Sequence, residues 1–131
     1  MSNMKILAIV GSRNFPDLRL VKDYVKDVYA LNNSHGAIKR IVSGGARGVD
    51  SLAEKTARAF NFYEKTFVAN WAKYGKQAGY IRNKEMIEYA DEVAAFWDGE
   101  SPGTKHSIDL ALKLRKSLII FVRFHSKGEK T

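Results

Sequence analysis

The sequence contains no cysteine, and this absence excludes two kinds of structure. No disulfide bond can stabilise the fold, and no thiolate can hold a metal ion. The three histidines, His35, His106 and His125, are too widely separated to show the spacing of metal ligands. The sequence therefore predicts neither a metal site nor a bound cofactor.

The chain also has no long hydrophobic run. A helix that crosses a membrane needs roughly 18 consecutive apolar residues, whereas the apolar run at residues 6–10 already ends at Gly11. That run is too short for a signal peptide, so we expect a cytoplasmic protein with no membrane partner. A chain of 131 residues fits one domain. We expect its core at residues 4–123 and a flexible tail at residues 124–131.

Positive charge predominates. The formal net charge is +8, with 22 Lys and Arg against 14 Asp and Glu. Such a charge favours anionic partners, among them phosphate ligands and nucleic acid. The lysines are spread along the chain without a dense run, and solubility is the alternative explanation.

Apolar runs and amphipathic stretches alternate along the whole chain. The runs predict strands at residues 5–10, 38–43, 63–69, 92–97 and 117–122. Helical spacing predicts one helix that starts after the cap residue Asp17, and further helices at residues 49–60, 80–90 and 105–116. Polar or glycine-containing loops are expected at residues 32–36, 70–79 and 98–103.

Strands that alternate with helices imply parallel pairing and right-handed crossovers. The strands at residues 7–10 and 118–122 are apolar on both faces, as expected when helices cover both sides of a sheet. The predicted fold class is therefore α/β, a Rossmann-like doubly wound parallel sheet of about five strands in three α/β/α layers.

The loops that follow the strands are the expected place for a ligand. In doubly wound sheets, ligands bind beyond the carboxyl ends of the strands, where the strand order reverses. Most of the glycine of the chain lies in the four loops concerned, at residues 11–15, 44–50, 70–79 and 98–104. Location and composition therefore both predict a ligand site at this edge.

The most informative loop reads Ser-Gly-Gly-Ala-Arg-Gly-Val-Asp at residues 43–50. Its glycines allow the backbone to turn tightly and to approach a ligand. The amide groups at the start of the following helix attract an anion, and Arg47 offers a bidentate grip on a phosphate. Asp50 either accepts bonds from a ribose hydroxyl or caps the helix. The alternative is a structural glycine-rich turn.

Three further segments extend this site. Gly-Ser-Arg at residues 11–13 follows the first strand and adds a hydroxyl and a guanidinium group. Arg82 and Asn83 are expected to face the strand ends from the third helix, with a solvated helix face as the alternative. Ser-Pro-Gly-Thr at residues 101–104 opens the last helix with a capping hydroxyl. Trp71 is a candidate for stacking on a base, although such aromatics also serve packing.

These segments together define the predicted ligand-binding residues. They are Gly11, Ser12, Arg13, Ser43, Gly44, Gly45, Arg47, Gly48, Asp50, Trp71, Arg82, Asn83, Ser101, Gly103 and Thr104. Asp98 and Glu100 form the acidic pair of the loops and are the candidate catalytic residues, because paired carboxylates perform acid–base and glycosidic chemistry. The alternative is that these acids bond backbone amides.

In this order and on these elements, Gly-Ser-Arg, Ser-Gly-Gly-Ala-Arg-Gly-Val-Asp, Arg-Asn and Ser-Pro-Gly-Thr resemble the motifs of the SLOG superfamily. That superfamily contains the Lonely Guy phosphoribohydrolases and the Smf/DprA DNA-processing proteins. The chain is most similar to the small stand-alone YspA/YpsA-like branch, from Ile6 to about Val122. The resemblance implies a Rossmann-like fold and a nucleotide-type site formed by the same loops.

The resemblance also shows one departure. Lonely Guy enzymes carry Pro-Gly-Gly-x-Gly-Thr-x-x-Glu, in which the glutamate is catalytic, and Ser107 occupies that position here. The leading hypothesis is therefore a sensor or scavenger that binds a phosphorylated nucleotide-type ligand. The alternatives are a phosphoribohydrolase that uses Asp98 or Glu100, and a protein that binds single-stranded nucleic acid.

Self-association is also expected. The predicted helices carry more apolar residues than one small sheet needs to bury, and relatives of this superfamily commonly form dimers or larger assemblies. The residues concerned are Tyr24, Tyr29, Phe60, Tyr80 and Ile87. We therefore predict a homodimer or higher homo-oligomer that is formed through a helix face.

Overall fold

The computed structural model describes residues 4–35, 38–45 and 47–126. A five-stranded sheet lies at its centre, with all neighbouring strands parallel and in the order β3-β2-β1-β4-β5. The strands are β1 (Lys5–Gly11), β2 (Ile38–Ser43), β3 (Tyr63–Thr66), β4 (Glu92–Trp97) and β5 (Ser117–Val122). This arrangement confirms the predicted α/β class and the parallel sheet.

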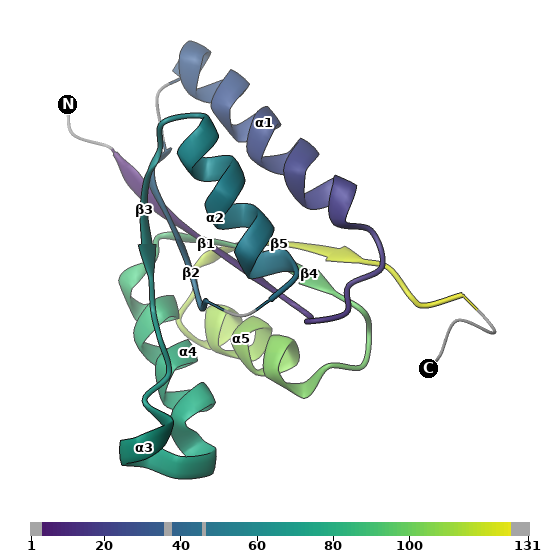
Figure 1. Cartoon of the computed structure of the whole chain (residues 1–131). Helices are drawn as coiled ribbons and strands as arrows, with labels where there is room; N and C mark the ends of the chain where they lie inside the picture. Colours follow the sequence, from purple (N-terminus) through teal and green to yellow (C-terminus); the bar gives the residue numbers. More distant parts are fainter. Residues whose placement is uncertain (1–3, 36–37, 46, 127–131) are drawn as a thin grey trace.

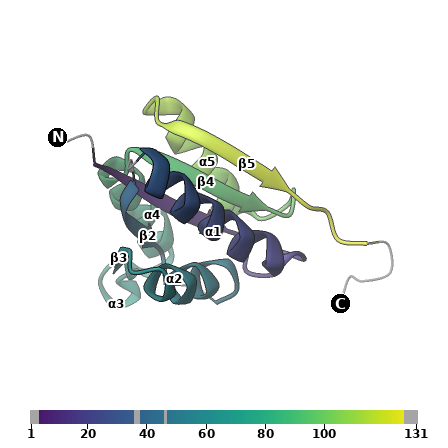
Figure 2. The same cartoon turned by 90° about the horizontal axis from the view of Figure 1, so that it is seen from above.

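Helices cover the two faces of the sheet and complete the three layers (Figures 1 and 2). One face carries α1 (Leu18–His35) and α2 (Val49–Ala59), and the other carries α4 (Ala78–Tyr89) and α5 (Pro102–Lys113). A short helix α3 (Trp71–Tyr74) and a 3-10 turn η1 (Gly75–Gln77) precede α4. No described segment forms a helix of the length and apolarity that a bilayer crossing requires.

The alternating side chains of β1 divide the core into two parts. Leu7 and Ile9 pack with α1 and α2, whereas Ala8 and Val10 pack with α4 and α5. These four side chains are at most 5% exposed. Burial of a single large apolar side chain stabilises a fold by about 1.5–3 kcal/mol. The two-sided burial of this strand explains why its sequence is apolar without a break.

The ends of α1 follow from two polar side chains. Asp17 accepts a hydrogen bond from the backbone N–H of Leu20 at 3.4 Å, which confirms Asp17 as the predicted cap. The helix then continues to His35, so the prediction of a loop from residue 32 was wrong. The Asn32 side chain makes two hydrogen bonds with the backbone of Ile38 and thereby ties the helix end to β2. Gly36 lies outside the described residues.

The segment at residues 70–79 was predicted as a loop and instead contains α3 and η1. Asn70 starts α3 because its side chain accepts a hydrogen bond from the N–H of Lys73 at 3.1 Å. The preceding strand β3 ends at Thr66 rather than at residue 69. The last helix begins earlier than predicted, at Pro102, because proline is favoured in the first turn of a helix.

The strand β5 differs from its prediction in its exposure. It lies at the edge of the sheet, and Ile119 and Ile120 are 45% and 40% exposed. The prediction that helices cover both of its faces was therefore wrong. Ile87, one of the apolar residues on which the helix-face dimer was predicted, is fully buried in the core, and Tyr24 and Phe60 pack against the core.

The strand order determines where a ligand site can form. The chain moves from β1 outward to β3 and then crosses back over the sheet to β4, on the other side of β1. The order therefore reverses between β1 and β4, which pair from Leu7 to Gly11. A crevice forms outside the carboxyl ends of two such strands.

Candidate functional site

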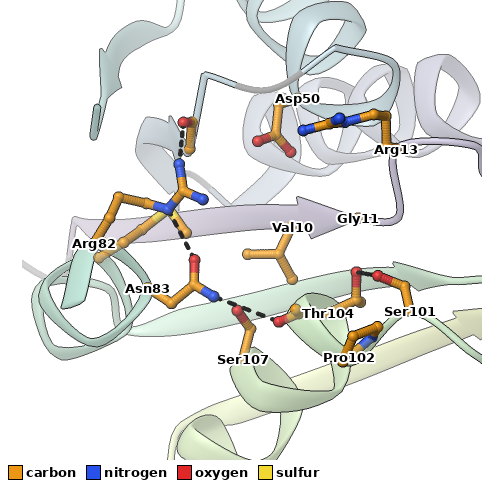
Figure 3. A pocket seen from close by; sticks show the side chains of 13 residues that line it. Val10, Gly11, Arg13, Asp50, Arg82, Asn83, Ser101, Pro102, Thr104 and Ser107 are labelled. Carbon is orange, nitrogen blue, oxygen red and sulfur yellow. Dashed lines mark hydrogen bonds between the residues drawn. The ribbon is translucent and has the colours of Figure 1, made fainter. Parts of the chain in front are cut away.

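A cavity of about 360 Å³ opens at the carboxyl ends of β1 and β4, as the reversal of strand order requires (Figure 3). It is bounded by the loops after β1 and β2, by α4, and by the first turn of α5. The residues that line it are Val10, Gly11, Arg13, Gly44, Asp50, Arg82, Asn83, Met86, Ser101, Pro102, Gly103, Thr104 and Ser107.

Nine of the predicted ligand-binding residues line this one cavity. They are Gly11, Arg13, Gly44, Asp50, Arg82, Asn83, Ser101, Gly103 and Thr104. Val10 and Met86 also line it and were not among the predicted ligand-binding residues. The signal for Met86 is its spacing, because it lies four residues after Arg82 on the same face of α4. Both apolar side chains belong to the core, so the cavity rests directly on it.

The loops after β1 and β2 fit together through Gly48. This residue has a φ of 76° and a ψ of −118°, a combination that is essentially restricted to glycine. A Cβ at position 48 would lie 2.5 Å from the carbonyl oxygen of Arg13. The missing side chain therefore allows the two loops to touch, and it sets the backbone from which Arg13 reaches the cavity.

Arg82 and Asn83 connect three loops across the cavity. Nη1 of Arg82 donates to the carbonyl oxygen of Gly44 at 2.5 Å and to that of Phe67 at 3.5 Å, and Nε donates to Oδ1 of Asn83 at 2.9 Å. The Asn83 amide in turn donates to the carbonyl oxygen of Gly103 at 3.4 Å. Figure 3 shows this chain of hydrogen bonds along one side of the cavity. It holds the loop after β2 and the start of α5 at a fixed separation.

The cavity contains charges of both signs. A Cβ at Gly44 would lie 2.8 Å from Nη1 of Arg82 and 3.0 Å from Oδ2 of Asp50, so the cation and the anion meet at this glycine. Burial lowers the pKa of Arg82, and the charge of Asp50 opposes that shift. An arginine stays protonated in proteins. Because Arg13 adds a second cation, the charged side chains of the lining carry a net positive charge.

The first turn of α5 presents amide groups to the cavity. The first N–H groups of a helix have no partner within the helix, and Ser101 at the cap position makes no side-chain cap hydrogen bond. No acidic residue occupies this first turn, and the nearest carboxylate, Asp98, bonds the N–H groups of Glu100 and Ser101 just before the helix. Such a helix end attracts a phosphate or another anion.

Two predicted hydroxyl residues support the loops and do not line the cavity. Ser12 is 1% exposed, lies 3.3 Å from the hydroxyl of Thr104, and accepts a hydrogen bond from the N–H of Asp98 at 3.1 Å. Ser43 is equally buried and donates to the carboxylate of Glu54 at 2.5 Å. These contacts join β1 to α5 and β2 to α2.

The remaining predicted ligand residues lie outside the cavity lining. Gly45 and Arg47 are exposed on the loop after β2, and Gly48 is half-buried at the loop contact described above. Trp71 is 60% exposed on α3. Ala46, part of the same motif, lies outside the described residues.

Neither predicted catalytic acid lines the cavity. Oδ1 of Asp98 accepts hydrogen bonds from the N–H groups of Glu100 and Ser101 at 2.9 and 2.8 Å, and Oδ2 lies 3.7 Å from Nε2 of His125. Burial raises the pKa of Asp98, but these hydrogen bonds and the charge of His125 together lower it below its usual value. Asp98 is therefore an ionised structural acceptor at neutral pH, and Glu100 is exposed to solvent.

The C-terminal segment lies against the same loop. A Cβ at Gly99 would come within 2.4 Å of the Phe124 ring, and His125 faces Asp98. Of the predicted flexible tail, residues 124–126 are described and residues 127–131 are not. The described part of the chain shows no group of three acidic or histidine side chains that could hold a metal ion.

Comparison with known proteins identifies relatives of this chain. The profile of the family described as DNA recombination-mediator protein A matches residues 1–94. The Gene 61 protein of Mycobacterium phage D29 is 37% identical over 125 residues, which cover 90% of this chain and 97% of the phage protein.

Solved structures share the fold at lower identity. DNA processing protein A from Streptococcus pneumoniae superposes with a TM-score of 0.72 and 14% identity, over 96% of this chain and 52% of that protein. DNA processing protein A from Helicobacter pylori, whose structure concerns a single-stranded DNA binding mode, gives a TM-score of 0.59 and 23% identity. The match covers 98% of this chain and 69% of that protein. The molybdenum cofactor carrier protein from Chlamydomonas reinhardtii gives a TM-score of 0.68 and 16% identity, over 91% of this chain and 78% of that protein.

Proposed function

The chain belongs to the DNA recombination-mediator protein A family, within the SLOG superfamily that its motifs predicted, and we propose that it binds a phosphorylated nucleotide-type ligand. The ligand occupies the cavity at the carboxyl edge of the sheet. Its phosphate lies against the first turn of α5, and Arg13 reaches it from the loop after β1. Asp50 accepts hydrogen bonds from the sugar hydroxyls.

One observation carries this proposal, namely that the first turn of α5, which holds no acidic residue, lies on the wall of a cavity with a net positive charge. Gly103 and Thr104 of that first turn and Arg13 of the loop after β1 line the same cavity. A volume of about 360 Å³ lies at the lower end of the range for small-molecule sites, which is about 300–1,000 Å³. Hydrogen bonds from a guanidinium to a phosphate are short and strong. Anion binding is the chemistry that this arrangement supports best.

Two solved neighbours with the same fold are described together with a ligand. One solved neighbour carries the molybdenum cofactor and another binds single-stranded DNA, as their descriptions state. Both proteins share the fold of this chain. We infer a phosphate-binding edge for this chain from its own cavity, and the neighbours are consistent with that inference.

Thermal unfolding tests the proposal directly. The protein is heated with inorganic phosphate, ribose 5-phosphate or AMP, each over a wide concentration range. A ligand at 100 times its Kd stabilises the folded state by about 2.7 kcal/mol, which raises the Tm of a domain of this size by roughly 8 °C. A Tm that stays constant with all three probes at millimolar concentration would overturn the proposed function.

A pair of arginine variants locates the site. Arg13→Ala removes an exposed side chain of the cavity, so its stability should change little, whereas phosphate affinity should fall by about 10- to 150-fold, the equivalent of one charge-assisted hydrogen bond. Arg19→Ala removes an equally exposed arginine on α1 and should keep full affinity. Equal losses in both variants would indicate a general charge effect instead of this cavity.

Binding of a single DNA strand is the second candidate, because exposed cations and aromatics extend beyond the cavity. Arg47 is exposed on the loop after β2, and Lys73 and Lys76 are exposed on α3 and η1. Trp71 and Tyr74 are exposed on α3, next to these two lysines in the chain. Aromatic faces next to cationic side chains are typical of surfaces that bind single strands. The part of this surface on α3 and η1 belongs to the crossover that also provides Arg82 and Asn83 to the cavity.

Salt dependence separates the two candidates. A strand held by several phosphate contacts loses affinity steeply as salt rises, and Lys76→Ala should reduce the logarithmic salt slope by about one. A mononucleotide held in the cavity depends much less on salt and not at all on Lys76. A labelled single-stranded oligonucleotide that fails to bind at low salt would exclude the second candidate.

A further inference from the structure

A single exposed tryptophan stands beside the cavity on a firmly positioned turn. The Asn70 side chain and carbonyl oxygen accept hydrogen bonds that start α3, from the N–H groups of Lys73 and Tyr74. The next residue, Trp71, is 60% exposed. Figure 1 shows α3 projecting past the end of β3, below α4. Trp71 therefore presents a large aromatic surface to solvent from the first position of a hydrogen-bonded helical turn.

The edge of the Trp71 ring reaches the helix that bounds the cavity. Cη2 of Trp71 lies 3.4 Å from the position that a Cβ of Gly79 would take, and Nη2 of Arg82 lies 3.9 Å from the same position. Arg82 lines the cavity. The indole thus adjoins the Arg82 side of the cavity, whereas Figure 3 shows the start of α5 on the other side.

We propose that Trp71 stacks on the nucleobase of the ligand and thereby determines its class. This inference rests on the proposed phosphate site. With the phosphate at α5 and the sugar near Asp50, a base that extends past Arg82 reaches the exposed indole of Trp71. Every base has an aromatic face that can stack in this way. The contact therefore favours ligands that carry a base but does not distinguish one base from another. The ligand class is a nucleotide with its base outside the cavity.

Binding measurements with two probes isolate this contact. AMP carries a base, and ribose 5-phosphate has the same sugar phosphate without one. Wild-type protein should bind AMP more tightly than ribose 5-phosphate by roughly tenfold or more, which corresponds to one stacked base. Trp71→Ala should lose this ratio and keep its affinity for ribose 5-phosphate, whereas Trp71→Phe should retain most of the ratio.

Tyr63→Ala provides the control, because Tyr63 is 64% exposed at the start of β3, the strand end remote from the cavity. Fluorescence gives a second readout, since AMP should quench the indole emission of the wild type and leave that of Trp71→Phe unchanged. An AMP to ribose 5-phosphate ratio that Trp71→Ala leaves intact would refute the stacking role alone. If neither probe binds the wild type, the proposed function fails and the stacking role fails with it.

A third probe distinguishes a free nucleotide from a nucleotide within a strand, because both present the same base and phosphate. A deoxyadenylate decamer that binds wild type at least 100-fold more tightly than AMP identifies a strand. A decamer that binds no more tightly than AMP identifies a free nucleotide. In either case Trp71→Ala should weaken the base-containing probe, and an unchanged affinity would contradict the proposal.

Discussion

Replacing Gly48 by alanine would place a methyl group against the backbone of the neighbouring loop. Position 48 has a φ of 76° and a ψ of −118°, and its Cβ would lie 2.5 Å from the carbonyl oxygen of Arg13. Two costs therefore combine, a backbone conformation that alanine rarely adopts and a close contact that forces one loop to move. We expect Gly48→Ala to destabilise the fold and to displace the loop that carries Arg13.

The size of the effect can be bounded with a second glycine. Gly75 has a φ of 59° and a ψ of −135°, but a Cβ there would meet no atom within 4 Å. Gly75→Ala therefore reports the backbone cost alone, about 1–3 kcal/mol. Gly48→Ala adds the contact with Arg13, so we expect a total of about 2–4 kcal/mol, a large part of the 5–15 kcal/mol that is typical of a domain.

Urea unfolding of the two variants provides the measurement. The free energy of unfolding of the two variants should differ by at least about 1 kcal/mol. In thermal unfolding, the loss of stability in Gly48→Ala corresponds to a fall in Tm of roughly 6–14 °C for a domain of this size. The same Gly48→Ala protein should bind phosphate ligands more weakly than Gly75→Ala, because only position 48 touches the Arg13 loop. If the two variants unfold at the same urea concentration, the loop contact at Gly48 has no energetic role.

Three further results are expected. Gly103→Ala should raise the free energy of unfolding by about 0.5–1 kcal/mol in urea unfolding, because a Cβ there meets no atom within 4 Å and alanine favours the helix; a loss would show that the first turn of α5 tolerates no side chain. The pKa of Asp98 is lowered in the fold, so the ionised side chain stabilises the folded state at pH values above the ordinary aspartate pKa of 3.8. This stabilisation is lost as the pH falls through the lowered pKa. In urea unfolding at pH 7, the free energy of unfolding of Asp98→Asn should therefore be about 1 kcal/mol lower than that of the wild type. This difference should be smaller at pH 3, and a difference that does not depend on pH would contradict an ionised Asp98. Self-association should proceed through the exposed apolar side chains of α5 and β5, so Leu112→Lys should reduce the light-scattering mass to that of one chain; a wild-type mass of one chain would rule out the oligomer.

The strands were predictable because their apolar runs are read from the sequence without knowledge of their neighbours. Four of the five predicted strands start and end within one residue of the structure, including the one at Ile38–Ser43. Their order across the sheet is set by tertiary packing, so the sequence did not show that β5 lies at an edge. The helix α3 was missed because four residues are too few to form an apolar stripe of helical period.

The candidate site was predictable to the level of its loops. Motifs at strand ends identified the segments that surround the cavity, because parallel strands bring their carboxyl ends together. The motifs did not show which side chains in those loops face inward. Ser12 and Ser43 have the polarity of ligand residues, yet both are buried in contacts between elements. For Asp98 the structure shows the alternative reading, in which a loop acid bonds backbone amides.

The connection from β3 to β4 has a consequence for how this protein can diversify. It crosses from the edge of the sheet over β2 and β1, it brings the Arg82–Asn83 pair to the cavity, and it places Trp71 outside the lining on the Arg82 side. All of its residues at positions 71–77 are exposed. Substitutions there can alter the molecular surface next to the ligand without loss of core packing. A library for new binding specificity can therefore be confined to this one turn of the chain.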